Sequence, residues 1–207
     1  MGARPGVRRL REAAEVLAVT VAAALALKTF VVDAVLVPSA SMEDTILPGD
    51  FLLVNKFVYG PSTPRHVPFW RGTLPVLRLP GPGSPHRGDV IVFFAPDAAA
   101  PRLYVKRLAA LPGDTLSIRG GTVFVDGRPV RPAAHAKLPG GNTPDFGPVG
   151  VPADSCFVLG DNLDESLDSR SWGFVPLASV IGRPIIVYWS VSPGGDVRWG
   201  RIFTIVR

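Results

Sequence analysis

The feature that constrains this chain most is an apolar stretch near its N-terminus, from Val16 to Leu27, that contains no charged residue. A bilayer core needs about 20 apolar residues, and this stretch alone is shorter. Residues 13–31 reach that length if Glu15 and Lys28 lie near the two membrane surfaces, where a lysine can extend its ammonium group into water. We therefore expect one transmembrane helix over residues 13–31, followed by a body that folds outside the lipid.

Arginines cluster ahead of this stretch and predict its orientation. Positive residues are retained on the cytoplasmic side of a membrane helix, which makes residues 1–12 a cytoplasmic basic tail and residues 32–207 an exported body. A cleaved signal peptide with its cleavage site near Ala34 is an alternative. A core helix of a soluble protein is the third interpretation, and the arginine cluster disfavours it. The arginines are Arg4, Arg8, Arg9 and Arg11.

The body is predicted to be mainly β. Its 22 glycines and 22 prolines interrupt short apolar runs that are typical of strands joined by turns. Gly120-Gly121 and Asp126-Gly127 separate successive runs and indicate a meander. Short helices are expected near Ser41 and over 176–180. Strands are expected at 50–54, 89–94, 103–108, 115–118, 122–125, 157–159 and 185–189, with pattern-poor insertions at 61–85 and 132–152.

Several classes of site are excluded by composition. Cys156 has no second cysteine to pair with, and its apolar neighbours predict a buried strand residue. The three histidines, His66, His86 and His135, lack the spacing of metal ligands, so we expect neither a metal nor a cofactor. The net charge is +5, but the arginines are dispersed and no basic–aromatic platform recurs, which argues against nucleic acid as a partner.

The segment Pro38–Met42 places serines directly after the membrane segment. A serine hydroxyl becomes a useful nucleophile only when a base removes its proton, and a lysine can be that base only when burial keeps it neutral. Of the four lysines, Lys28 lies in the membrane segment, Lys56 is expected to be solvated, and Lys137 lies in a Pro-rich loop. Lys106 lies within an apolar strand and is the candidate base for Ser41.

Three blocks of sequence resemble bacterial type I signal peptidase, the Ser/Lys-dyad leader peptidase of peptidase family S26. They follow the membrane segment in the family's order and span most of residues 13–190. Leu163 and Glu165 stand where the family often has Arg and Asn, and Ala40 replaces a common glycine. The blocks are 38–50 with 56–57, then 87–93 with 104–107 and 111–114, and lastly 160–162 with Ser166, 168–170 and 172–173.

The resemblance implies roles at matching positions. Ser41 would be the nucleophile and Lys106 the general base, while the Ser39 hydroxyl and the Ser41 backbone N–H would bind the oxyanion. Ser166 would orient Lys106, and Gly160 would allow close approach of the backbone. Asp168 and Arg170 would form a structural ion pair. Pockets for the small residues of an Ala-x-Ala site would be lined by Val35, Val37, Met42, Ile46 and Val105, beside a substrate strand running along 33–37 and 103–105.

The resemblance implies an N-terminal transmembrane helix followed by an antiparallel β-sheet catalytic domain, with residues 115–155 as a small accessory β insertion. The expected function is a serine endopeptidase of the bacterial inner membrane that cleaves signal peptides from exported preproteins. Membrane lipid and the secretion translocase are further expected partners, with Phe69, Trp70 and Trp199 dipping into the interface. Two alternatives stay open: a Ser/Lys self-cleaving regulator, and a non-catalytic membrane-tethered β module that binds signal peptides.

Overall fold

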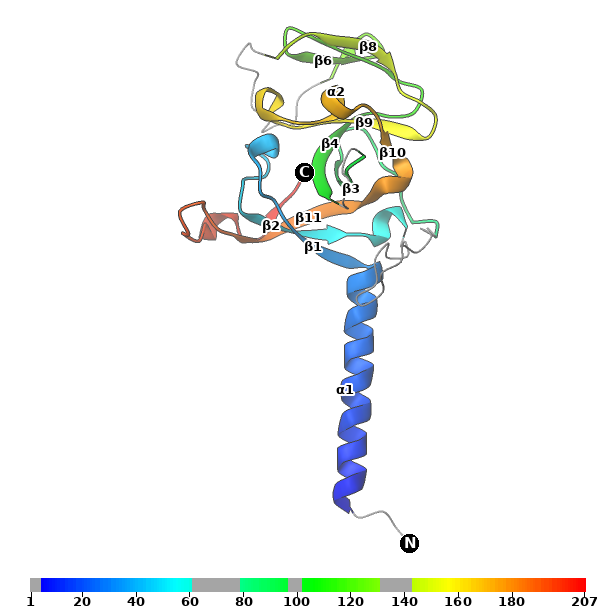
Figure 1. Ribbon diagram of the computed structural model, residues 1–207, viewed down its shortest axis with the longest axis vertical. Helices are drawn as coiled ribbons and strands as arrows, with labels where there is room; N and C mark the ends of the chain where they lie inside the picture. The colour runs from blue at the N-terminus through cyan, green and yellow to red at the C-terminus, as the bar shows by residue number, and fades with distance from the viewer. Residues whose placement is uncertain (1–4, 61–78, 97–101, 131–142) are drawn as a thin grey trace.

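A computed structural model describes residues 5–60, 79–96, 102–130 and 143–207. It shows a single long helix that projects from a β-rich body (Figure 1). Phe69, Trp70 and Lys137, on which predictions were made above, lie outside the described residues, as do His66 and His135.

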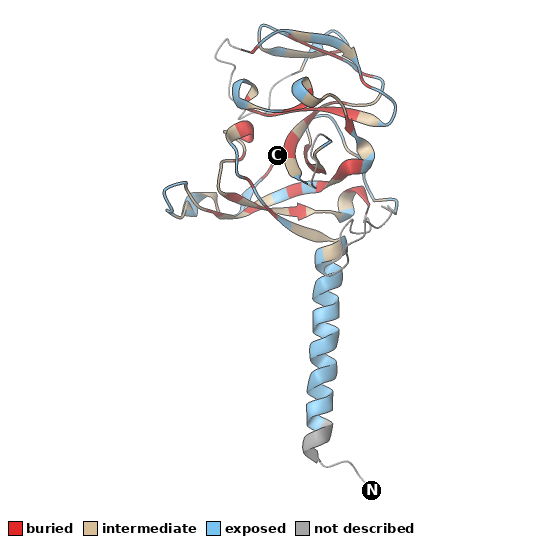
Figure 2. Ribbon diagram, in the orientation of Figure 1, coloured by how far each residue is buried: buried red, intermediate tan, exposed pale blue. Residues whose placement is uncertain are grey.

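The projecting helix, α1, runs from Pro5 to Phe30. Its segment Arg9–Phe30 is long and apolar enough to cross a membrane, since 22 residues rise about 33 Å. None of that segment is buried against the body, whereas many residues in the strands of the body are buried (Figure 2). Only Val31 separates α1 from the first strand, so the body begins directly at the end of the helix.

The main sheet has eight antiparallel strands, which confirms the mainly β fold class. Its order is β1-β2-β11-β3-β4-β9-β10, with β12 paired to β11. Strands far apart in sequence, such as β2 and β11, therefore lie side by side. The bounds are β1 Val32–Leu36, β2 Asp50–Asn55, β3 Val90–Phe94, β4 Leu103–Ala110, β9 Ser155–Leu159, β10 Val175–Pro176, β11 Val180–Ser190 and β12 Thr204–Ile205.

A second sheet of four strands, in the order β7-β6-β5-β8, packs beyond the main one (Figure 1). Its last strand corrects the sequence analysis, which treated 132–152 as an insertion without regular pattern. Phe146-Gly147-Pro148-Val149-Gly150 has low β-propensity, but it pairs with β5 at the sheet edge, where a proline is tolerated. The bounds are β5 Thr115–Arg119, β6 Thr122–Val125, β7 Arg128–Pro129 and β8 Phe146–Gly150.

Short helical turns connect the strands. The turn η1 carries Ser41, and the fully buried Met42 and Ile46 anchor that segment in the core between β1, β2 and β3. The expected short helices near Ser41 and over 176–180 correspond to η1 and η4. The turns are η1 Ala40–Met42, η2 Phe57–Tyr59, η3 Leu163–Glu165, α2 Ser169–Trp172, η4 Leu177–Ser179 and η5 Trp199–Arg201.

Among the described strands, two of the edges that lack a ladder partner belong to β1 and to the first half of β4. β1 pairs with β2 on one side only. On β4, the pairing with β9 begins at Arg107, which leaves Leu103–Lys106 paired to β3 alone. Both open edges belong to the groove described next.

Candidate active site

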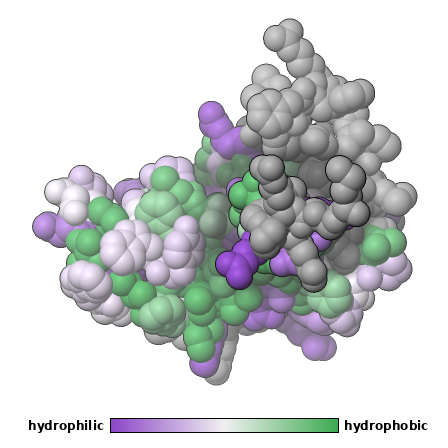
Figure 3. Space-filling view, turned by 90° about the horizontal axis from the view of Figure 1, so that it is seen from below, coloured by the Kyte–Doolittle hydropathy of each residue, from purple (hydrophilic) through white to green (hydrophobic). Residues whose placement is uncertain are grey.

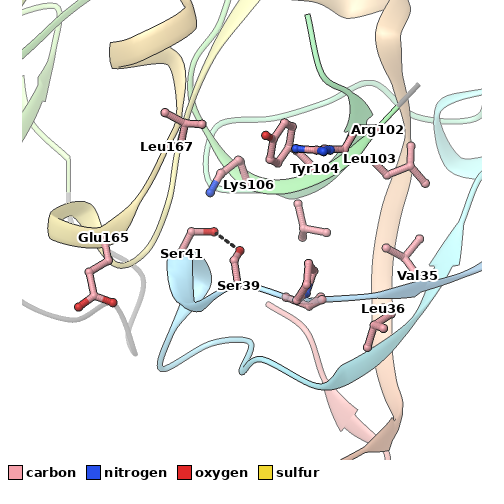
Figure 4. Close-up of a pocket in the computed structure, with 13 residues that line it drawn as sticks. Val35, Leu36, Ser39, Ser41, Arg102, Leu103, Tyr104, Lys106, Glu165 and Leu167 are labelled. Carbon is pink, nitrogen blue, oxygen red and sulfur yellow. Dashed lines mark hydrogen bonds between the residues drawn. The ribbon is translucent and has the colours of Figure 1, made fainter. Parts of the chain in front are cut away.

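A groove of about 540 Å³ runs between the open edges of β1 and β4 and ends at η1 and η3. Ser41 and Lys106 both line it, from segments 65 positions apart in the chain (Figure 4). The fold thus brings together the serine and the lysine that the sequence analysis paired. The full lining is Val35, Leu36, Val37, Pro38, Ser39, Ser41, Arg102, Leu103, Tyr104, Val105, Lys106, Glu165 and Leu167.

Ser41 sits on η1 with 6% of its surface exposed. Its Oγ lies 3.2 Å from the Oγ of Ser39, which precedes the turn in an extended conformation. The backbone of the turn is held from the other side of the groove, because the N–H of Asn162 donates to the Ser41 carbonyl at 3.1 Å. The Nδ2 of Asn162 also donates to the Ala40 carbonyl at 3.3 Å. The nucleophile candidate is therefore fixed at the backbone while its hydroxyl faces the groove.

Lys106 lies on β4 with only 1% of its surface exposed. Burial lowers the pKa of its ammonium group to about 8; the Asp168 carboxylate opposes this shift and the Arg170 guanidinium adds to it. Its Nζ donates to Ser166 Oγ at 3.1 Å. Among the hydrogen bonds of the described residues none joins Nζ to Ser41 Oγ, although the two side chains face each other in Figure 4. Such contacts often tighten only when substrate is bound.

Gly160 follows β9 at the point where Ser166, the partner of Lys106, meets the turn that carries Ser41. A Cβ atom at this position would lie 2.2 Å from Ser166 Oγ and 2.4 Å from the Ser41 carbonyl oxygen. These distances are far below van der Waals contact, so there is no room for a side chain at this position and only glycine fits. Any side chain here would displace Ser166, which holds Lys106, or the turn that carries Ser41.

Asp168 and Arg170 form an ion pair behind this loop. Arg170 donates to the fully buried Asp168 carboxylate through Nε at 2.8 Å and Nη2 at 2.9 Å. The same carboxylate accepts the Gly160 N–H at 3.1 Å and caps α2 by accepting the Arg170 N–H at 3.2 Å. Nη2 of Arg170 also donates to the carbonyls of Leu163 and Ser166. The pair thus fixes both ends of the loop that bears Ser166.

A second polar network was missed by the sequence analysis. Asp161 accepts two hydrogen bonds of 2.7 Å from Arg107, the neighbour of Lys106, and one of 2.6 Å from Thr45 Oγ1. Thr45 belongs to the segment that carries Ser41, so Asp161 ties that segment to β4. Both Asp161 and Thr45 stand in the recognised sequence blocks, but only the folded chain shows that they meet.

The segment between Ser41 and β2 is also held by residues near the C-terminus of the chain. Asp50 is fully buried and accepts hydrogen bonds from Ser190, the Leu47 N–H and Arg201. Burial by itself would raise the pKa of Asp50, but these donors and the charge of Arg201 lower it overall. Arg201 also donates to the Thr45 carbonyl at 3.1 Å. The C-terminal part of the chain therefore supports the segment between Ser41 and β2.

The residues expected to form substrate pockets divide into two groups. Val35, Val37 and Val105 line the groove. Met42 and Ile46 do not, because both are fully buried in the core and η1 turns Met42 away from Ser41. They are anchors of the turn, and the groove-lining role stays with the three valines.

The prediction that Lys56 is solvated was wrong. Its side chain is 13% exposed, and its Nζ lies 3.5 Å from the Asp33 carboxylate at the junction of α1 and β1. It is not among the residues that line the groove. Cys156 is fully buried in β9, as expected.

Comparison with known proteins gives consistent matches. The family model described as signal peptidase, peptidase S26, matches residues 10–189. The chain is 35% identical over 196 residues to signal peptidase I of Leptolyngbya laminosa, covering 91% of this chain and 84% of that relative. It is 34% identical over 176 residues to the probable signal peptidase I-2 of Synechocystis sp., covering 83% and 70%. It is 32% identical over 209 residues to signal peptidase I of Pseudomonas aeruginosa, covering 80% and 68%.

Proposed function

This chain belongs to the signal peptidase family, peptidase S26, and from that membership we propose that Ser41 and Lys106 are the catalytic dyad with which it removes signal peptides from preproteins. The chain is a serine endopeptidase associated with the membrane. The observation that carries the dyad is the nearly complete burial of Lys106 in the groove that Ser41 lines. Family membership favours this function over a self-cleaving regulator or a non-catalytic module.

The mechanism follows from the protonation state of the lysine. Neutral Lys106 takes the proton from Ser41 Oγ as that oxygen attacks the carbonyl carbon of the scissile peptide bond. The carbonyl oxygen becomes an oxyanion that accepts hydrogen bonds from the Ser39 hydroxyl and the Ser41 N–H. Protonated Lys106 then gives its proton to the leaving amine, which leaves an acyl group on Ser41. Water then attacks this ester while Lys106 takes its proton, and Lys106 returns that proton to Ser41 Oγ as the acyl group leaves, which regenerates the serine hydroxyl and the neutral lysine.

The substrate is proposed to lie as a strand between the open edges of β1 and β4. Both edges offer unpaired backbone N–H and C=O groups to an extended peptide. Val35, Val37 and Val105 line the groove with apolar surface, which suits the small apolar side chains of an Ala-x-Ala site. A fluorogenic Ala-x-Ala peptide incubated with the purified chain in detergent tests this function, with Ser41→Ala as the control. Absence of cleavage by the wild-type chain would contradict it.

Activity should depend on pH through Lys106. Its pKa is lowered to about 8, so the neutral, basic form predominates above that pH and the protonated form below it. Only the neutral form can accept the Ser41 proton, and kcat/KM should therefore fall about tenfold per pH unit below pH 8 and level off above it. A kcat/KM profile that stays flat down to about pH 6 would contradict a lysine base.

Ser39→Ala should lower kcat by about 10²-fold or more, because an oxyanion loses one of its donors. The Ser39 hydroxyl lies 3.2 Å from Ser41 Oγ, within reach of an oxygen on the carbon that Ser41 attacks. Ser39→Thr keeps the hydroxyl and should recover most of the loss in a kcat measurement. Equal losses in both variants would show that the hydroxyl is not the source of the effect.

The membrane arrangement is proposed as a single α1 span in the bacterial inner membrane with a cytoplasmic N-terminus. The arginines before and at the start of the span and the exposed apolar surface of Arg9–Phe30 support it. Seen from the α1 end, the molecule shows much apolar surface, to which the helix itself contributes (Figure 3). In the body, Trp199 and Phe203 are 72% and 73% exposed, which suits contact with lipid. Digestion of the body by protease added outside spheroplasts tests the orientation. Contact with the translocase stays a prediction.

A further inference from the structure

We propose that Glu165 reads the charge of the residues that directly follow the cleavage site, favouring a basic residue there and disfavouring an acidic one. The inference rests on the proposed function and concerns its substrate specificity. Glu165 is the last residue of η3, its side chain is exposed, and it lines the same groove as Ser41 and Lys106.

The position of Glu165 relative to Ser41 decides which part of a substrate it meets. In Figure 4, Val35 and Leu36 lie on one side of Ser41 and Glu165 lies on the other. The strand-shaped part of the groove, between β1 and β4, lies on the side of the two apolar residues and begins near the end of α1. A signal peptide that leaves the membrane occupies that part, so the chain beyond the scissile bond passes Glu165.

The carboxylate is held close to the nucleophile. Asn162 Nδ2 lies 3.4 Å from Glu165 Oε2 and 3.5 Å from Glu43 Oε2, and the Asn162 N–H donates to the Ser41 carbonyl. Two carboxylates therefore converge on one amide beside the catalytic turn. An amide carries no charge and leaves the negative charge of both carboxylates in place.

Among the described residues, the arginines beside the dyad are engaged elsewhere. Arg102 also lines the groove, but it lies on the side of Ser41 opposite Glu165 (Figure 4). Arg107 makes two hydrogen bonds to the Asp161 carboxylate, and Arg170 makes two to the Asp168 carboxylate. Lys106 donates to Ser166 and must be neutral to act as the base. Among the described residues that line the groove, none forms an ion pair with Glu165, so a substrate cation can complement it. The exposed position of the carboxylate means that forming such a pair requires little desolvation.

The test uses the full chain in detergent and Ala-x-Ala peptides that differ only in carrying Lys, Gln or Glu at the first or second position after the cleavage site. At low salt, kcat/KM for the Lys peptide should exceed that for the Glu peptide by about two- to fivefold at one of these positions. This ratio should shrink toward one in Glu165→Gln, where only the Glu43 carboxylate remains, and reverse in Glu165→Lys. High salt should shrink the ratio in the wild-type chain.

Asp154→Asn is the matched control, since it removes one negative charge from an exposed residue that does not line the groove. It should keep the wild-type ratio. A wild-type ratio in Glu165→Gln, or a wild-type preference for the Glu peptide, would overturn the inference while leaving the proposed function intact. Failure to cleave any of the peptides would instead contradict the proposed function, and the inference with it.

Discussion

Lys106→Ala is expected to lower kcat/KM for an Ala-x-Ala peptide by about 10⁴-fold or more, and Ser41→Ala by as much. Without Lys106, the described residues that line the groove offer Ser41 no neutral amine or imidazole as a base, and the serine hydroxyl stays protonated at neutral pH. The measurement is cleavage of the fluorogenic peptide by purified variants. Because the two residues act as one unit, the double variant should be no slower than either single variant.

Lys56→Ala is the matched control for this result. Lys56 is also a mostly buried lysine, but it pairs with Asp33 at the junction of α1 and β1 and does not line the groove. It should retain most of the activity. Cleavage by Lys106→Ala at a rate close to that of Lys56→Ala would show that another group is the base.

Gly160→Ala should lower kcat by about 100-fold, the scale of loss that a shift of about 1 Å in a catalytic group can cause. The added methyl group would lie 2.2 Å from Ser166 Oγ and 2.4 Å from the Ser41 carbonyl oxygen, so at least one of them must move. Either movement changes the distance and orientation of the Lys106 amine relative to the Ser41 hydroxyl. Peptide cleavage measures the loss, and circular dichroism reports whether the sheet is intact.

Gly150→Ala is the control for this substitution. Gly150 lies on β8, and a Cβ atom there meets nothing within 4 Å. The variant should therefore cleave the peptide like the wild-type chain. Full activity in Gly160→Ala would mean that the loop between β9 and α2 yields without disturbing the dyad, contrary to the geometry described.

The sequence was informative where a residue type is rare in its setting. Lys106 stands out because a charged side chain within an apolar strand is costly unless its pKa falls, and Ser41 because it lies in a serine cluster shortly after the membrane segment. Strands with β-branched and aromatic residues, such as β3 and β4, were likewise predictable. The resemblance to the family connected these features across most of the chain.

The sequence could not predict in which direction a side chain points from a turn, or which distant segments of the chain meet. Met42 and Ile46 are apolar and close to Ser41, but the turn of η1 directs them into the core and not into the groove. The partner of Lys56 lies on β1, and this pairing follows only from sheet register. β8 was hidden because tertiary pairing with β5 overrides the poor β-propensity of its Gly and Pro residues.

The acyl group on Ser41 offers the most direct test of the proposed dyad. An activated ester that ends in Ala-x-Ala has a better leaving group than a peptide bond, so acylation becomes fast and the acyl-enzyme should accumulate. Intact-mass spectrometry of the acid-quenched chain should then show one added acyl group that maps to Ser41 and forms far more slowly in Lys106→Ala. An acyl group on another residue, or one that forms at the wild-type rate in Lys106→Ala, would contradict the Ser41/Lys106 mechanism.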